Sequence, residues 1–133
     1  MKLTIIRLQQ LSEQDRQDLG KIWPEKNIAA LEGSLDEQHR LYAARFNDRL
    51  LAALRLEISG VQGKLYDLQV REVTRRRGVG RYLLEETLAQ NPSLMHWWIA
   101  QDGREDPAVI AAFMQACGFH TQIDGWVKKV MSV

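Results

Sequence analysis

Residues 75–80 read Arg75-Arg76-Arg77-Gly78-Val79-Gly80 and lie between an apolar strand pattern and an amphipathic helix pattern. Strand-forming residues precede them from Leu65 to Val73, and apolar residues recur afterwards on one helical face as far as Leu88. The two glycines therefore lie at a helix start, where unpaired backbone N–H groups and the helix dipole attract anions. Glycine lets a ligand approach the backbone, and arginine suits phosphate oxygens. The pattern predicts a di- or polyphosphate site.

Two familiar phosphate loops do not fit this stretch. A P-loop requires Lys-Ser or Lys-Thr after its last glycine, but Gly80 is followed by Arg81-Tyr82, and a dinucleotide fingerprint requires glycine where Leu83 stands. The stretch resembles the Q/R-x-x-G-x-G/A pyrophosphate loop of the GNAT acetyltransferase superfamily, with Arg75, Gly78 and Gly80 in the three places. The alternative is a basic, solvated turn, but adjacent arginines repel one another and favour an anionic partner.

The bulk composition is that of an ordinary globular domain. The chain has 133 residues, of which 45% are hydrophobic and 26% charged, so we expect one domain over residues 1–133. It shows no membrane-span pattern and no signal-peptide pattern, which predicts a cytoplasmic protein. Cys117 is expected to be a buried helix residue, and the three histidines lack metal-ligand spacing, so we predict no metal site.

The hydrophobic patterns and breakers give an order of elements without repeats or linkers. The first half is expected to hold a strand over Lys2 to Leu8, a helix from Ser12 to Trp23 ended by Pro24, and a loop with partial helix over Glu25 to Gln38. Strands Arg40 to Phe46 and Leu50 to Ile58 follow, joined by the turn Asn47-Asp48-Arg49, and a turn from Ser59 to Gly63 leads to the central strand. The second half is expected to hold a helix ended by Asn91-Pro92, a strand Met95 to Ala100 parallel to the central one, a helix Ala108 to Cys117 stopped by Gly118, and final strands over Phe119 to Val130.

This order matches the GNAT layout over essentially the full length. Phe113-Met114-Gln115-Ala116-Cys117-Gly118-Phe119 also looks like the late helix of that superfamily, which ends in Gly-Phe. The predicted fold class is therefore α/β (α+β), a GNAT acyl-CoA N-acyltransferase fold with a mixed twisted sheet flanked by helices.

The GNAT resemblance implies where acetyl-CoA or CoA would bind. The central strand of the superfamily splays from the next one and binds the pantetheine arm through its backbone. Residues implied for pantetheine are Leu68, Gln69 and Val70, and those implied for the pyrophosphate are Thr74, Arg75, Arg76, Arg77, Gly78, Val79, Gly80 and Arg81.

The machinery for acetyl transfer looks incomplete. Met114 stands where many relatives carry the tyrosine that protonates the leaving thiolate, and a thioether cannot donate a proton. Pro107 stands in place of an asparagine at the start of that helix. Asp67, Glu72 and His96 are candidate bases, each with an ordinary structural explanation, so we assign no catalytic residue. A CoA-binding regulator is a better interpretation than an enzyme.

A closer resemblance supports that interpretation. Lys21 to Glu25, Tyr42 to Asn47, Val70 to Gly80 and Trp97-Trp98 look like the bacterial GNAT-like maturation and regulatory factors of aspartate 1-decarboxylase. The similarity departs in the loop Lys26 to Gln38 and beyond Trp126, where the tail Val127 to Val133 looks longer.

What this family implies is a protein that binds acetyl-CoA or CoA and docks on the decarboxylase proenzyme. Docking would promote the self-cleavage that forms the pyruvoyl group and would inhibit the mature enzyme, so CoA would limit its own synthesis through β-alanine and pantothenate. The ligand and the partner would each raise the affinity for the other. The implied protein is a monomer when free, with no membrane or nucleic-acid partner.

Partner contacts are less determined by the sequence. Arg71 and the three arginines from Arg75 to Arg77 carry more charge than one pyrophosphate needs, so some could reach partner carboxylates or the partner's C-terminus. Trp97 and Trp98 point to opposite faces of a strand, so either both are core or one lies near the ligand groove or interface. Asn47 is most simply a turn residue, with a ligand or partner role as the weaker hypothesis.

Two other functions stay open from sequence alone. One is an active N-acetyltransferase for a small-molecule or protein amine, although the sequence shows no acceptor pocket. The other is a nucleic-acid-binding module that uses the arginine run, which a net charge of only +1 disfavours.

Overall fold

The computed structural model describes residues 3–70, 79–100, 114–122 and 125–129. Predictions that concern Arg71 to Gly78, including Glu72 and Thr74, lie outside the described residues, as does Pro107. In the described chain the strands form a 7-stranded sheet in the order β1-β2-β3-β4-β5-β7-β6. The strands are β1 Thr4–Leu8, β2 His39–Phe46, β3 Arg49–Ser59, β4 Gln62–Val70, β5 His96–Ala100, β6 His120–Gln122 and β7 Gly125–Lys129.

The sheet is mixed, as the sequence predicted. β1 to β4 form an antiparallel meander, and β4 pairs with β5 in parallel because α3 Val79–Ala89 carries the chain back across the sheet. β7 then pairs antiparallel with β5, and β6 forms the outer edge. The part of the tail beyond Trp126 that the structure describes, Val127 to Lys129, belongs to β7, which lies between β5 and β6 in the sheet.

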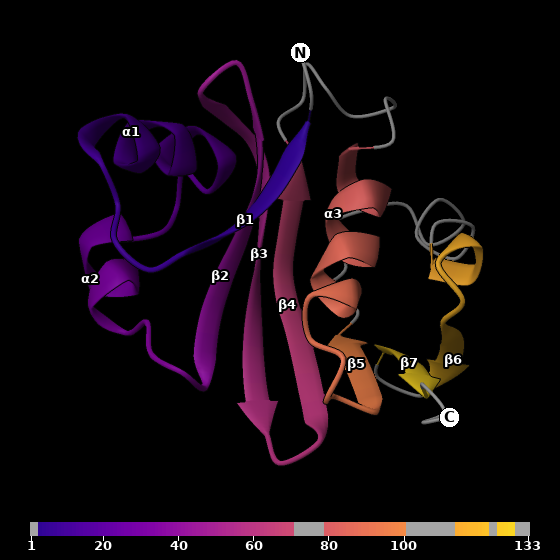
Figure 1. Cartoon of the computed structure of the whole chain (residues 1–133). Helices are drawn as coiled ribbons and strands as arrows, with labels where there is room; N and C mark the ends of the chain where they lie inside the picture. Colours follow the sequence, from indigo (N-terminus) through magenta and orange to yellow (C-terminus); the bar gives the residue numbers. More distant parts are fainter. Residues whose placement is uncertain (1–2, 71–78, 101–113, 123–124, 130–133) are drawn as a thin grey trace.

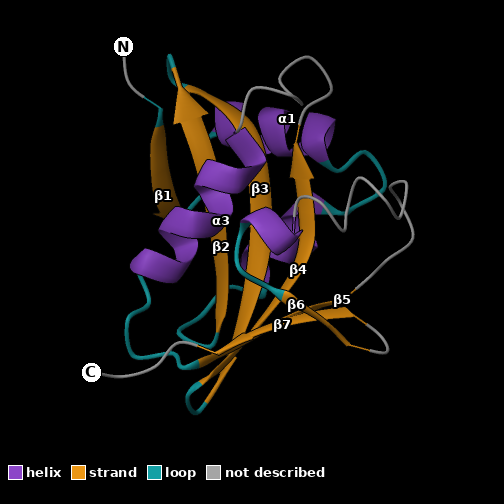
Figure 2. Ribbon diagram, turned by 90° about the vertical axis from the view of Figure 1, so that its right-hand side faces the viewer, coloured by secondary structure: helices purple, strands orange, loops and turns teal. Residues whose placement is uncertain are grey.

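Helices cover both faces of the sheet. α1 Glu13–Ile22 and α2 Ile28–Gly33 lie on one face, and α3 lies on the other (Figures 1 and 2). α1 begins at Ser12, whose hydroxyl accepts from the N–H of Asp15 while the Asp15 carboxylate accepts from the N–H of Ser12. This reciprocal capping box explains why the helix begins where the sequence predicted.

Two apolar clusters separate along the two faces. The α3-side cluster contains buried residues of β1 to β5, α3 and the segment from Met114 to Phe119. The α1-side cluster contains buried residues of α1 and α2 and those residues of β2 and β3 whose side chains face these helices. Representative members are Leu54, Leu65, Leu83, Leu84 and Trp97 for the first, and Leu19, Trp23, Leu41 and Ala53 for the second.

The two hairpin turns are shorter than predicted. Only Asn47 and Asp48 lie between β2 and β3, and both have positive φ (53° and 62°), as a two-residue type I′ turn requires. Arg49 already belongs to β3. Between β3 and β4 only Gly60 and Val61 remain, because Ser59 and Gln62 form the last strand pair.

The end of the late helix is described and matches its sequence. Residues 114–116 are helical, Gly118 has φ 85°, and the N–H groups of Gly118 and Phe119 donate to the carbonyls of Gln115 and Met114. This is a Schellman ending, in which glycine takes the left-handed position. Phe119 is thereby returned to the core, where it is 2% exposed.

Candidate functional site

The central strand separates from its parallel neighbour part-way along its length. β4 pairs with β5 from Gln62 to Leu65, opposite His96 to Ile99, and the register between the two strands ends there. β4 continues beside β3 as far as Val70, opposite Ala52. The residues predicted to contact pantetheine, Leu68, Gln69 and Val70, therefore lie beyond the β4–β5 pairing, where a splayed strand presents its backbone to a ligand.

The helix that follows, α3, is described from Val79 onward, and both Val79 and Gly80 are buried. Arg81 is exposed, and its guanidinium forms a hydrogen-bonded ion pair with Glu85 one turn along the helix, which raises the pKa of Arg81. Of the predicted pyrophosphate residues, the structure therefore describes Val79, Gly80 and Arg81, and Thr74 to Gly78 lie outside the described residues.

A β-bulge in β4, at Asp67, is a feature that the sequence analysis missed. The pairing with β3 shifts between Ala53, which faces Gln69, and Arg55, which faces Tyr66. Asp67 has φ 58°, the left-handed region that few side chains other than Asp and Asn tolerate. A signal was present, because the apolar positions Leu65 and Leu68 break the period-2 alternation of a regular strand.

The described candidate bases lie at different places along β4. The carboxylate of Asp67 lies 3.1 Å from Lys26 Nζ and 3.5 Å from Arg55 Nη1, so two cations already hold it. His96 is exposed and pairs with Gln62, at the opposite end of β4. Met114 is buried at 2% exposure among core residues, and its thioether donates no proton there.

The adjacent tryptophans take different environments. Trp97 is 1% exposed and belongs to the α3-side cluster, whereas Trp98 is partly buried on the other face with Lys64 Nζ 5.2 Å from its ring centroid. Of the two alternatives that the sequence left open, the structure makes Trp97 a core residue and leaves Trp98 only partly buried. Asn47 is confirmed as an exposed turn residue.

Cys117 is buried, as predicted, and burial raises the pKa of its thiol. Its backbone carbonyl accepts a hydrogen bond from Lys128 Nζ at 3.0 Å. Among the residues that the structure describes, no group of His, Cys, Asp or Glu could hold a metal ion. None of the described helices is long and apolar enough to cross a membrane.

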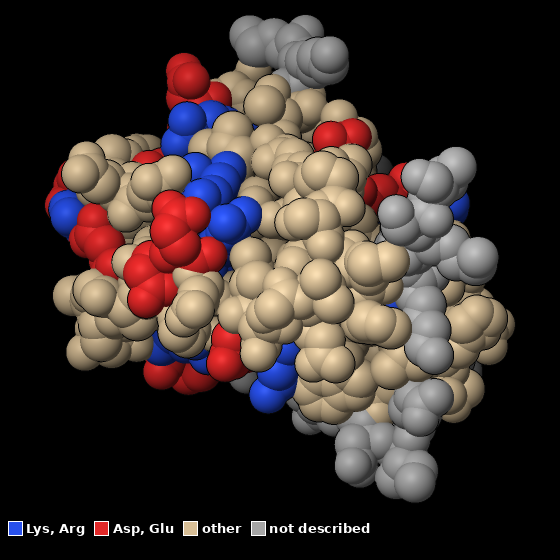
Figure 3. Space-filling view, turned by 60° about the horizontal axis from the view of Figure 1, so that its bottom comes forward, with Lys and Arg blue, Asp and Glu red and all other residues tan. Residues whose placement is uncertain are grey.

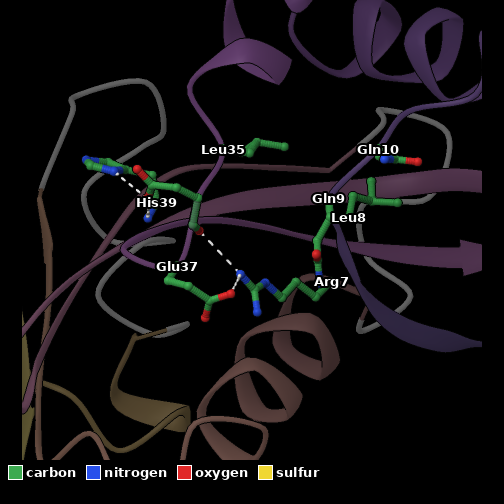
Figure 4. A pocket seen from close by; sticks show the side chains of 8 residues that line it. Arg7, Leu8, Gln9, Gln10, Leu35, Glu37 and His39 are labelled. Atoms are coloured by element: carbon green, nitrogen blue, oxygen red, sulfur yellow. Dashed lines mark hydrogen bonds and ion pairs between the residues drawn. The ribbon is translucent and has the colours of Figure 1, made fainter.

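Two surface hollows lie away from the strand end. One, of about 420 Å³, lies between β1 and the connection from α2 to β2 (Figure 4). There Arg7 points toward Glu37, and its guanidinium donates to the carbonyl of Asp36 at 3.3 Å. The hydrogen bond from His39 lowers the pKa of Asp36. The charges in this hollow pair with one another, which favours a structural role.

The second hollow, of about 530 Å³, lies on the face of β4 and β5 that carries Lys64 and Trp98.

The surface over α1 and α2, at the left of Figure 3, shows basic and acidic side chains side by side. Nucleic-acid binding favours clustered positive charge, so this described face does not support a nucleic-acid interface.

Comparisons with known proteins identify the family. Residues 2–127 match the family model of the acetyltransferase (GNAT) domain PanZ. The chain belongs to the PanZ family. Two curated relatives are named PanD regulatory factor: the chain is 60% identical to the Salmonella typhimurium LT2 protein over 97% of this chain and all of that one, and 60% identical to the Escherichia coli K12 protein over 96% and 99%.

Solved structures agree with this placement in the PanZ family. The solution NMR structure of Escherichia coli YhhK bound to coenzyme A is 60% identical, has a TM-score of 0.87 and covers 98% of this chain and 100% of that one. The Escherichia coli ribosomal-protein-S18-alanine N-acetyltransferase has a TM-score of 0.73 at 15% identity, over 93% of this chain and 90% of that one. The second likeness confirms the GNAT fold alone.

Proposed function

We propose that this protein binds acetyl-CoA or CoA and in that state regulates aspartate 1-decarboxylase. It promotes self-cleavage of the proenzyme to the pyruvoyl form and inhibits the mature enzyme, which gives feedback control of β-alanine, pantothenate and CoA synthesis. It acts in the cytoplasm, as one domain and as a monomer when free. The observation that carries the proposal is the 60% identity, over nearly the whole chain, to proteins named PanD regulatory factor. We take the PanD in that name to be the proposed partner, aspartate 1-decarboxylase, which the sequence resemblance also implies.

The end of β4 supports the ligand part of the proposal. Leu68 to Val70 extend past the β4–β5 pairing and would bind pantetheine through their backbone. Thr74 to Arg81 would hold the pyrophosphate at the start of α3. The relative YhhK was solved with coenzyme A, at 60% identity to this chain. When bound, either ligand would supply phosphate charge, and acetyl-CoA would supply an acetyl thioester where CoA has a free thiol.

The buried Met114 supports a regulatory rather than a catalytic role. A transferase of this fold needs a donor near the leaving thiolate, and the thioether of Met114 lies 2% exposed inside the α3-side cluster. Of the described candidate bases, Asp67 is held in ion pairs and His96 lies at the far end of β4. The chain is therefore proposed to bind acetyl-CoA without turning it over.

Calorimetric titration of the protein into decarboxylase proenzyme, with and without acetyl-CoA, tests the proposal. Binding should depend on acetyl-CoA, because a ligand shared by both proteins couples their affinities reciprocally. A gel of the same samples should show proenzyme cleavage only when all three components are present. A complex that forms equally without acetyl-CoA, or no complex at all, would refute the regulatory function.

Steady release of CoA in the presence of an amine acceptor would instead support an N-acetyltransferase. The matched control is Met114→Leu, which keeps the apolar volume of the buried site. It should leave acetyl-CoA binding and complex formation unchanged if Met114 has no chemical role.

A further inference from the structure

The bulge in β4 changes which residues face the core beyond it. In the pairing with β3, Leu54 alone lies opposite Asp67 and Leu68, since Ala53 faces Gln69 and Arg55 faces Tyr66. The extra residue reverses the alternation of the strand. A regular strand would turn Asp67 and Gln69 toward the face of Leu65.

The apolar side chains follow this reversal. Gly63 and Leu65 are buried on the α3 side before the bulge, and Leu68 and Val70 pack against the same α3-side cluster after it. The bulge at Asp67 lies two residues after Leu65, where pairing with β5 ends. It therefore sets both the side-chain phase and the direction of the strand segment that leaves β5.

Three groups from the other side of the sheet hold the bulged residue. The indole N–H of Trp23 donates to the backbone carbonyl of Asp67 at 2.9 Å, and Trp23 is fully buried. Lys26 Nζ lies 3.1 Å and Arg55 Nη1 3.5 Å from the Asp67 carboxylate. The Arg55 guanidinium also lies 4.8 Å from the ring centroid of Tyr66, the residue before the bulge.

This arrangement connects the N-terminal layer to the proposed ligand strand. Trp23 ends α1, and Lys26 lies in the short connection to α2, yet both bind a residue of the central strand. Each contact is directional, unlike apolar packing, so each constrains where the Asp67 backbone lies. The carbonyl contact fixes the peptide, and the two cations favour a carboxylate at the bulge.

We propose that Asp67 is a positioning residue for CoA binding. Held by Trp23, Lys26 and Arg55, it keeps β4 bulged so that Leu68 to Val70 leave β5 in the orientation that receives pantetheine. This inference rests on the proposed function, because it assumes that CoA binds at this strand end. It adds that the connection after α1, on the face opposite α3, determines the affinity of the CoA site.

Isothermal titration of CoA into four variants, each paired with a thermal melt, tests the proposal. Asp67→Val should weaken binding about tenfold, because a β-branched residue opposes positive φ and the bulge then has to form against strain. Asp67→Asn tolerates positive φ and loses only the charge, so it should weaken binding about threefold or less. Trp23→Phe keeps an apolar ring without the N–H and should also weaken binding about threefold.

Asp18→Asn is the matched control. Asp18 is a fully buried carboxylate of α1 that also binds an arginine of β3, but it contacts the β2–β3 hairpin rather than β4. Its melting temperature should fall while its CoA affinity stays within about twofold of the wild type. A loss of affinity in Asp18→Asn equal to that in Asp67→Val would show that destabilisation alone weakens binding, and would overturn the proposal.

An NMR titration adds a readout that a purely structural role would not move. The indole N–H resonance of Trp23 should shift when CoA is added to the wild-type protein, because ligand and bulge are coupled reciprocally. An unmoved resonance, or wild-type affinity in both Asp67→Val and Trp23→Phe, overturns the positioning role and leaves the proposed function intact. A wild-type protein that does not bind CoA overturns the proposed function and this inference with it.

Discussion

The two faces of the sheet hold their helices by different combinations of forces. α3 packs through apolar side chains such as Leu83 and Leu84, both fully buried. α1 also buries apolar residues, but two of its carboxylates bind arginines of the β2–β3 hairpin: Asp15 lies 3.1 Å from Arg45 and Asp18 lies 2.7 Å from Arg49.

The difference separates stability from placement. Apolar burial is proportional to area and has little directional preference, so it stabilises the sheet without fixing a particular backbone angle. Ion pairs and hydrogen bonds are directional, and on the α1 face they hold the two arginines that flank the Asn47–Asp48 turn and the bulge at Asp67. The α3 face should therefore respond most to lost volume, and the α1 face to lost charge and to pH.

The largest effect is expected for Trp97→Ala on the α3 face. Trp97 is 1% exposed, and its truncation should lower the free energy of unfolding by about 3–5 kcal/mol through lost burial and a cavity. The matched control is Trp98→Ala, on the next residue but the other face and only partly buried, which should cost about 1 kcal/mol. Urea unfolding of the two variants measures the contrast, and equal losses would show that the two faces do not differ in this way.

Asp18→Asn should give the largest effect of a charge change on the α1 face. Asp18 is fully buried and accepts from Arg49 and from the N–H of Leu50. We expect a loss of about 2 kcal/mol in the free energy of unfolding, less than for a fully buried pair because the Arg49 side chain is 40% exposed.

The control for Asp18→Asn is Glu85→Gln on α3, which breaks the exposed pair with Arg81. That change should cost no more than about 0.5 kcal/mol. A cost for Asp18→Asn as small as this would mean that the buried carboxylate does not anchor the helix.

The ionised carboxylate of Asp18 should also make the stability of the protein depend on pH. Burial by itself raises the pKa of Asp18, but hydrogen bonds from Arg49, Leu50 and Gln14 outweigh it and hold the pKa below its ordinary value of 3.8. The stabilisation that ionised Asp18 contributes is therefore fully present above pH 3.8. It is lost as the pH falls from there through the lower pKa that Asp18 has in the folded state.

Urea unfolding at a series of pH values below neutral measures this effect. The gap in the free energy of unfolding between wild type and Asp18→Asn should be constant near neutral pH and narrow in that acid window. A gap that widens as pH falls would contradict the lowered pKa of Asp18.

Local signals in the sequence were enough to predict most elements. The Ser12 cap, the two-strand pattern around Asn47-Asp48 and the strand before the glycines each act over a few residues, so the pattern contained the information. The resemblance to a known family supplied the remaining order of helices and strands.

What the sequence did not reveal depends on contacts between distant residues. The Trp23 indole and the Asp67 carbonyl meet only after α1 packs on the sheet, and Asp18 finds Arg49 in the same way. The place of β7 between β5 and β6 likewise follows from pairing across the sheet. The spacing of the apolar residues Leu65 and Leu68 was a local signal of the bulge, but the contacts that hold Asp67 could not be inferred without the fold.

The smallest effect is expected at the two hairpin turns, where backbone angle alone is tested. Asp48 has φ 62° and is exposed, so Asp48→Gly should raise the free energy of unfolding by about 0.5–1 kcal/mol by removing the cost of a left-handed side chain. Gly60 has φ 60° with nothing within 4 Å of an added Cβ, so Gly60→Ala should lower it by about 1 kcal/mol from strain alone. Urea unfolding of both variants compares the turns directly. Changes of opposite sign in the free energy of unfolding would confirm that the backbone angle limits the stability of both hairpins. A lower free energy of unfolding in Asp48→Gly would instead mean that the Asp48 side chain itself supports the turn between Arg45 and Arg49.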